Sequence, residues 1–308
     1  MIQRIRRFLS LFAKAGNGFV NDNAFKLSAS LSYYTVFALG PLLLIIISLA
    51  GIFFGREAVQ GKIYLQLSGL VGTEAAVQIQ NIIKNVHHTH SSTAGAIIGA
   101  VILVIGATGV FTEMQDSINY IWSVRAKPKK SWLKYLSNRL LSFSLVVGLG
   151  FLLLVSLVIN ALLNLLSDRL THYFPNFTVF VFNWINIGII VVAITGLFAV
   201  IYKVLPDAVI SWRDAFTGAL ITALLFLLGK FGIGYYLARS NLDVTYGTAA
   251  SIVIILSWIY YSALILFYGA EFTKMYALHH GKGIHPKETA VFIIKRESKE
   301  VPTSYLDT

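Results

Sequence analysis

The chain has 308 residues, of which 56% are hydrophobic and only 13% are charged, and its mean hydropathy is +0.71. Soluble domains carry about a quarter charged residues, so this composition excludes an ordinary globular protein and predicts a chain that crosses a membrane several times. The net charge of +11 would indicate nucleic acid as the partner of a soluble protein. In a membrane protein the same charge is explained by basic residues that gather in cytoplasmic loops.

The first 26 residues are basic, and Ile5, Phe8 and Phe12 recur at helical spacing. This pattern predicts an amphipathic helix lying on the membrane surface, with a disordered basic tail as the alternative. The next two predicted features are an apolar span at 28–54 and a second interfacial helix that Thr73 can cap.

Five further apolar segments follow, and each is long enough to cross a bilayer, which takes about 20 helical residues. Four of them lie near residues 94–122, 140–166, 177–204 and 246–275. The remaining one, the fifth span of the chain, ends near residue 238, and Ser211 or Asp214 can cap its start. The predicted fold is therefore an all-α membrane protein, a bundle of six transmembrane helices with additional amphipathic interfacial helices.

Most of the 25 lysine and arginine residues fall at the two termini and in the connecting segments 123–139 and 203–213. Because cytoplasmic loops are enriched in these residues, the distribution predicts that both termini are cytoplasmic. This predicted topology divides the chain into three parts. They are a basic cytoplasmic or interfacial segment at 1–26, a six-span membrane domain at 27–278 and a polar cytoplasmic tail at 279–308.

The second span carries Glu113, Asp116 and Asn119, which share one helix face at spacings of three residues. Carboxylates in membrane segments are costly, so they carry a functional hypothesis by default. Glu113 lies 19 residues into a span that enters from outside, which is roughly 28 Å along the axis and therefore near the cytoplasmic end. Lys230 lies roughly 24 Å up its own span, which disfavours a pair with Glu113 unless the helices are broken or strongly tilted.

Three more charged residues are expected in the same cytoplasmic layer. Glu271 ends the sixth span, while Lys203 and Arg213 flank the fourth connector. One interpretation is a polar cavity among the spans, formed with Glu113, Asp116 and Asn119, that takes a substrate head group or a coupling proton. The other interpretation is a set of helix caps and salt bridges that fix the helix ends.

Enzymatic motifs are absent from the sequence. No phosphate-binding loop and no hydrolase nucleophile motif occur. The cluster at His87, His88 and His90 has the residue type of a zinc or copper site, but no fourth ligand at usable spacing, and an exposed pH-sensitive loop explains it better. The chain also has no cysteine, which excludes disulfides and thiolate metal ligands. We therefore expect no cofactor, no metal and no enzymatic activity.

Several short motifs, in this order and spacing, resemble the YihY/BrkB family of inner-membrane proteins. They are Tyr33-Tyr-Thr, Gly109 to Trp122, Leu205-Pro-Asp-Ala with Trp212-Arg-Asp-Ala, Tyr246-Gly-Thr-Ala-Ala-Ser, and Trp258-Ile-Tyr-Tyr-Ser with Gly269-Ala-Glu. The resemblance covers residues 20–278 and implies a multi-pass protein of the bacterial plasma membrane with about six spans.

Members of that family have been described as virulence or serum-resistance factors, and some are linked to export of envelope lipids or small molecules. An older label, a tRNA-processing ribonuclease, conflicts with this sequence, because a metal nuclease needs clustered ligands on the cytoplasmic side. The leading expectation is a transporter, exporter or flippase-like protein for an amphipathic or anionic envelope metabolite. The alternative is a non-transporting envelope scaffold. The expected partners are the lipid bilayer and a lipid or small-molecule substrate, with no nucleic acid.

Overall fold

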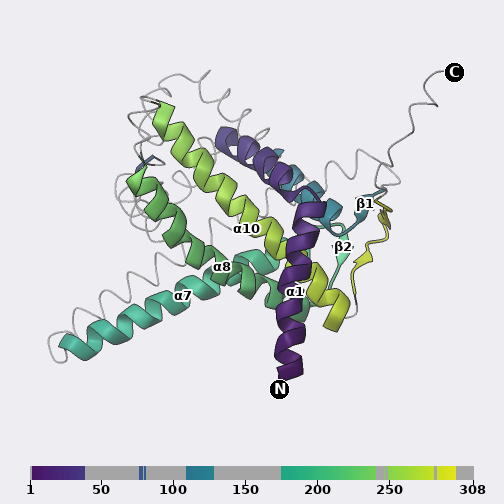
Figure 1. The fold of residues 1–308 in the computed structure, drawn as a ribbon, viewed down its shortest axis with the longest axis horizontal. Helices are drawn as coiled ribbons and strands as arrows, with labels where there is room; N and C mark the ends of the chain where they lie inside the picture. The colour runs from purple at the N-terminus through teal and green to yellow at the C-terminus, as the bar shows by residue number, and fades with distance from the viewer. Residues whose placement is uncertain are drawn as a thin grey trace, which may run out of the picture.

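The computed structural model is predominantly helical, as the composition predicted. It describes residues 2–38, 76–78, 80, 109–127, 175–240, 246, 249–280 and 283–295. Figure 1 shows that α8 and α10 run side by side, that α7 packs against α8, and that α1 crosses α10. These contacts join the N-terminal helix to the last long helix of the chain.

The N-terminal segment forms α1 (Ile2–Asn21), which confirms that this segment is helical rather than a disordered tail, while its position on the membrane surface stays a prediction. Its buried side chains Leu11 and Ala15 pack with Phe272 of α10. A tight turn follows, in which Asn23 adopts a left-handed φ of 53° that asparagine tolerates better than most residues. A second helix then runs over 24–38. The turn places Asp22 at the corner between two helices.

Three helices are long and apolar enough to cross a membrane within the described residues. They are α7 (Pro175–Val204), α8 (Trp212–Arg239) and α10 (Ala250–His280). Leucines and aromatics project outward from them, for example Phe231, which is 74% exposed, as expected of surfaces that face lipid. The predicted spans 28–54 and 94–122 are described only in part and 140–166 lies outside the described residues, so the count of six stays a prediction.

Small residues allow the long helices to pack closely. Ala215, Ala219 and Ala223 repeat every four residues on α8 and are completely buried, which gives one face of α8 a smooth stripe that neighbouring helices can approach. Ser211 caps the start of α8, since its hydroxyl accepts a hydrogen bond of 3.1 Å from the Asp214 amide. Of the two caps that the sequence offered, Ser211 is therefore the one used.

After α10 the chain folds back as a short extended segment, residues 283–295, that we call the strap. It contains β3 (His285–Pro286) and β4 (Ala290–Phe292). β4 pairs antiparallel with β1 (Val124–Ala126), which follows the helix at 109–121, and β3 pairs with β2 (Ala208–Val209), which lies between α7 and α8. The strap thereby ties together two connectors that are far apart in the sequence.

Candidate functional site

Four charged side chains meet where α1, α10 and the strap come together. This charge cluster consists of Asp22, Glu271, Lys274 and Lys295. Lys295 Nζ lies 2.6 Å from Asp22 Oδ2, and Lys274 Nζ lies 3.3 Å from the same oxygen and 3.0 Å from Glu271 Oε2. The Lys274 ammonium therefore bridges the Asp22 and Glu271 carboxyl groups. Two carboxyls and two ammonium groups thus form one connected network.

The two lysines also cap a neighbouring helix. The backbone carbonyl of Ile121, at the end of the helix at 109–121, accepts from Lys274 Nζ at 2.8 Å and from Lys295 Nζ at 3.4 Å. Last-turn carbonyls have no partner inside their own helix, and cations at that end are favourable. Lys295 Nζ also lies 4.3 Å from the centre of the Tyr120 ring, a cation–π contact. The cluster therefore holds four chain segments together.

The backbone of α1 approaches the charge cluster closely. Glu271 is completely buried, and Gly18 of α1 lies directly against it. A Cβ atom at position 18 would lie 2.7 Å from Glu271 Oε2, which is too short for a real contact. Glycine at this position thus lets α1 pack onto the carboxylate.

The environment shifts the pKa values of two members outside the long helices. Burial acts to raise the pKa of the Asp22 carboxyl, but its hydrogen bonds to Glu271 and Lys295 and the charges of Lys274 and Lys295 outweigh burial and hold the pKa below its ordinary value. Burial lowers the pKa of the Lys295 ammonium, and Asp22 offsets only part of that effect. Asp22 is therefore the firmly ionised anchor of the network, and Lys295 depends on it.

A second buried polar group, the connector cluster, consists of Gln115, Asn119 and Asp207. Asn119 Nδ2 donates to Asp207 Oδ2 at 3.0 Å, and the Asp207 backbone amide donates to Asn119 Oδ1 at 2.8 Å. Gln115 Nε2 donates to the same carboxylate oxygen at 3.3 Å. This two-way pairing fixes the connector between α7 and α8 to the helix at 109–121, a structural role.

The residues predicted from the sequence to share one layer fall into separate environments. Asn119 belongs to the connector cluster and Glu271 to the charge cluster. Lys203 donates to the Ile210 carbonyl and lies 5.7 Å from the centre of the Trp212 ring.

The other three predicted residues lie on helix surfaces. Arg213 and Asp116 are exposed, and Glu113 is partly buried. Among the described residues, no hydrogen bond or ion pair joins Glu113 to Glu271 or to Arg213. The roles of these residues in binding stay predictions.

Three members of the charge cluster were missed from the sequence. Asp22 carried one usable signal, because it is the only acidic residue among the first 50. Lys274 and Lys295 gave none, since they looked like ordinary basic residues of a helix end and a polar tail. Recognising them required knowing that the strap folds back onto α1.

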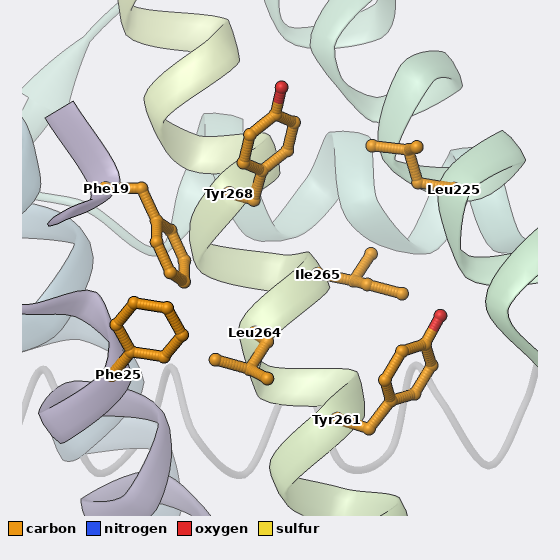
Figure 2. Close-up of a pocket in the computed structure, with 7 residues that line it drawn as sticks. All are labelled: Phe19, Phe25, Leu225, Tyr261, Leu264, Ile265 and Tyr268. Carbon is orange, nitrogen blue, oxygen red and sulfur yellow. The ribbon is translucent and has the colours of Figure 1, made fainter. Parts of the chain in front are cut away.

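An apolar and largely open pocket of about 350 Å³ lies between the N-terminal helices, α8 and α10. Figure 2 shows Phe19 and Phe25 of the N-terminal helices facing α10. The remaining lining residues are Leu225 of α8 and Tyr261, Leu264, Ile265 and Tyr268 of α10. Phe19 follows Gly18, which touches Glu271, and Tyr268 lies one helical turn before Glu271. The pocket and the charge cluster are therefore near each other along α1 and α10, although no member of the cluster lines the pocket.

Histidine and carboxylate side chains are the groups that could hold a metal ion in a chain without cysteine. No group of three such side chains that could hold an ion occurs in the described part of the chain. The cluster at His87, His88 and His90 lies outside those residues.

Known proteins resemble this chain over most of its length. A UPF0761 membrane protein of Ralstonia nicotianae is 29% identical over 81% of this chain and 54% of its own length. Another, of Tolumonas auensis, is 28% identical over 88% of this chain and 85% of its own length. A third, of Delftia acidovorans, is 30% identical over 80% and 57%. The chain thus spans little more than half of the Ralstonia and Delftia proteins.

No solved structure matches the chain. The family model described as Virulence factor BrkB matches residues 15–291, which include α1 from its middle, the three long helices and most of the strap. These relatives are named as membrane proteins, in agreement with the apolar helices of this chain. The chain is a membrane protein that belongs to the BrkB virulence-factor family.

Proposed function

We propose that this protein moves an amphipathic envelope metabolite with an anionic head group across the bacterial plasma membrane. The observation that supports the proposal is the open apolar pocket of about 350 Å³ whose lining residue Tyr268 lies one helical turn along α10 from Glu271. Ligand pockets typically measure 300–1,000 Å³ and combine apolar walls with a few polar groups. The size and lining of this cavity suit one end of a hydrocarbon chain.

Lys274 and Lys295 of the charge cluster favour a substrate with an anionic head group. Lys295 is the more exposed of the two, with 24% of its side chain accessible, and its ammonium is held by Asp22. A phosphate or carboxylate head group would compete with Asp22 for the same ammonium hydrogens. Charge-assisted hydrogen bonds of this kind are the strong ones in partly buried sites.

Orientation in the membrane is part of the same proposal. The basic connectors and termini support placing the charge cluster at the cytoplasmic end, so that a substrate enters from inside. Reporter fusions after residues 208 and 285 should then report the cytoplasm, and a fusion after residue 242 should report the outside. A cytoplasmic signal at residue 242 would reverse the orientation.

Reconstitution into vesicles tests transport directly, with a phosphatidylglycerol that carries a fluorophore on its acyl chain. We expect the protein to move this lipid between leaflets, and Leu264→Trp to slow the movement at least tenfold because the indole fills the cavity. Leu256→Trp is the matched control, since Leu256 lies on the same helix, is 38% exposed and does not line the cavity.

Two results would count against transport. Folded wild-type protein that moves neither this lipid nor small anionic solutes refutes the proposal and favours the envelope scaffold. If Leu264→Trp and Leu256→Trp reduce the transport rate equally, the pocket is not the route of transport. Glu271→Gln adds a second comparison, because it removes the carboxyl group one helical turn beyond Tyr268 while keeping the side chain's shape.

A further inference from the structure

One carboxylate oxygen in the charge cluster lacks a hydrogen-bond donor. Glu271 Oε1 is buried and receives no hydrogen bond, although its neighbour Oε2 accepts from Lys274. An ammonium group has three hydrogens. Lys274 directs its three toward Glu271 Oε2, Asp22 Oδ2 and the Ile121 carbonyl. Lys274 therefore has no hydrogen left for Glu271 Oε1.

The proximity of Asp22 and Glu271 raises the same question. Lys274 Nζ bonds an oxygen of each carboxyl, which holds the two groups close together, and ionised carboxylates, which only accept hydrogen bonds, repel each other. A single proton on one carboxyl removes the repulsion, and a proton on Glu271 Oε1 turns the unsatisfied acceptor into a hydroxyl group. Protonation of the pair therefore accounts for both observations, the unsatisfied oxygen and the two neighbouring carboxyls.

We propose that Asp22 and Glu271 form a binding site for one exchangeable proton, and that Lys295 couples the occupancy of this site to the docking of the strap. The inference goes beyond transport and does not depend on it. Its ligand is the proton, and its readout is the position of residues 283–295.

The charge balance sets the direction of the coupling. Without the proton, two carboxylates face two ammonium groups and the cluster is neutral. With the proton, one positive charge is left in excess, so the attraction that holds Lys295 weakens. The charged groups that act on the pair from the packed elements are Lys274 on α10 and Lys295 on the strap. We therefore expect the strap to loosen as the site gains its proton.

The strap contributes the most accessible side chain of the cluster, since Lys295 is 24% exposed whereas Glu271 is completely buried. The strap is held elsewhere by β-pairing, with the Ile293 amide donating to the Ser123 carbonyl at 2.9 Å. His285, Lys287 and Glu288 also lie on the strap. They are the same in the wild type and in Glu271→Gln, so a comparison of the two proteins isolates the response that passes through Lys295.

Infrared spectroscopy of the full chain in nanodiscs tests the proton site. From mildly acidic to mildly alkaline pH, we expect one titrating carboxylic-acid band that both Glu271→Gln and Asp22→Asn remove. Glu113→Gln is the matched control, because Glu113 is a partly buried carboxylate outside the cluster, and the band should persist. Glu271→Asp keeps a protonatable group and should shift the band without deleting it.

Hydrogen exchange of residues 283–295 tests the coupling in the same samples. The strap sequence is identical in wild type and Glu271→Gln, so their exchange ratio at each pH cancels the intrinsic chemistry. We expect this ratio to change at least fivefold across the titration, with slower exchange in the wild type at high pH. Lys295→Met should keep the infrared band and abolish the change in ratio. A wild type with no such band, or with a constant ratio, overturns the proposal.

Discussion

Neutralising Asp22 should release the strap, because this carboxylate is the anchor of Lys295. Isolated surface ion pairs contribute about 0–1 kcal/mol, and breaking a fully buried pair costs about 3–5 kcal/mol. The side chains of Asp22, Lys274 and Lys295 are 9%, 15% and 24% exposed, which lies between those limits. We therefore expect Asp22→Asn to weaken strap docking by about 2 kcal/mol, a factor of about 30 in the opening equilibrium.

Hydrogen exchange at the Ile293 and Lys287 amides measures this opening, because both donate backbone hydrogen bonds of 2.9 Å that hold the strap. Their exchange should be about 30-fold faster in Asp22→Asn. Glu288→Gln is the control, since Glu288 is an exposed carboxylate on the strap itself. In the Lys295→Met background, Asp22→Asn should cost much less, because its partner is already gone. Exchange within about twofold of wild type, or strict additivity, would refute the reasoning.

Three further predictions follow from the same contacts. The pKa of the Asp22 carboxyl is held below its ordinary value of 3.8. Ionised Asp22 therefore stabilises strap docking fully above pH 3.8, and this stabilisation is lost as the pH falls through the lowered pKa. Hydrogen exchange of the strap should accordingly accelerate in strong acid in the wild type but not in Asp22→Asn. Gly18→Ala should lower the thermal midpoint of unfolding because the new Cβ would displace Glu271. Gly16→Ala is the control, since a Cβ there meets nothing within 4 Å, and it should leave the fold unchanged or stabilise it by about 0.5–1 kcal/mol. Equal effects of the two substitutions would contradict the close approach of Gly18 to Glu271. Asn119→Ala should cost about 2–3 kcal/mol in unfolding assays, since it removes one donor to the buried Asp207 carboxylate and the acceptor of the Asp207 backbone amide, and an unchanged midpoint would contradict that reasoning.

Local features of the fold were predictable from local sequence. The spacing of Phe8 and Phe12 predicted α1, because a helix places residues four apart on one face, and both side chains pack against Phe272. Ser211 was one of two residues with a side chain suited to cap α8. The charge cluster was not predictable in this way, since Asp22 and Lys274 are 252 residues apart and helical periodicity does not say which helices meet.

The stretch from residue 109 to 122 stood out in the sequence for its acidic face, but the long-range polar contacts converge on its last turn. There Asn119 binds the connector between α7 and α8, Tyr120 lies under an ammonium group, the Ile121 carbonyl accepts from two lysines, and the Trp122 indole donates to α10 at 3.0 Å. Backbone and side chains of four consecutive residues thus contact the connector, α10 and the strap. A rearrangement of the strap must change the contacts of this helical turn. The same helical turn holds the connector from which α8 starts. The acidic face that includes Glu113 lies on the preceding turns of the same helix, so proton binding at the charge cluster can reach it by moving the helix end, without any direct contact between the carboxylates.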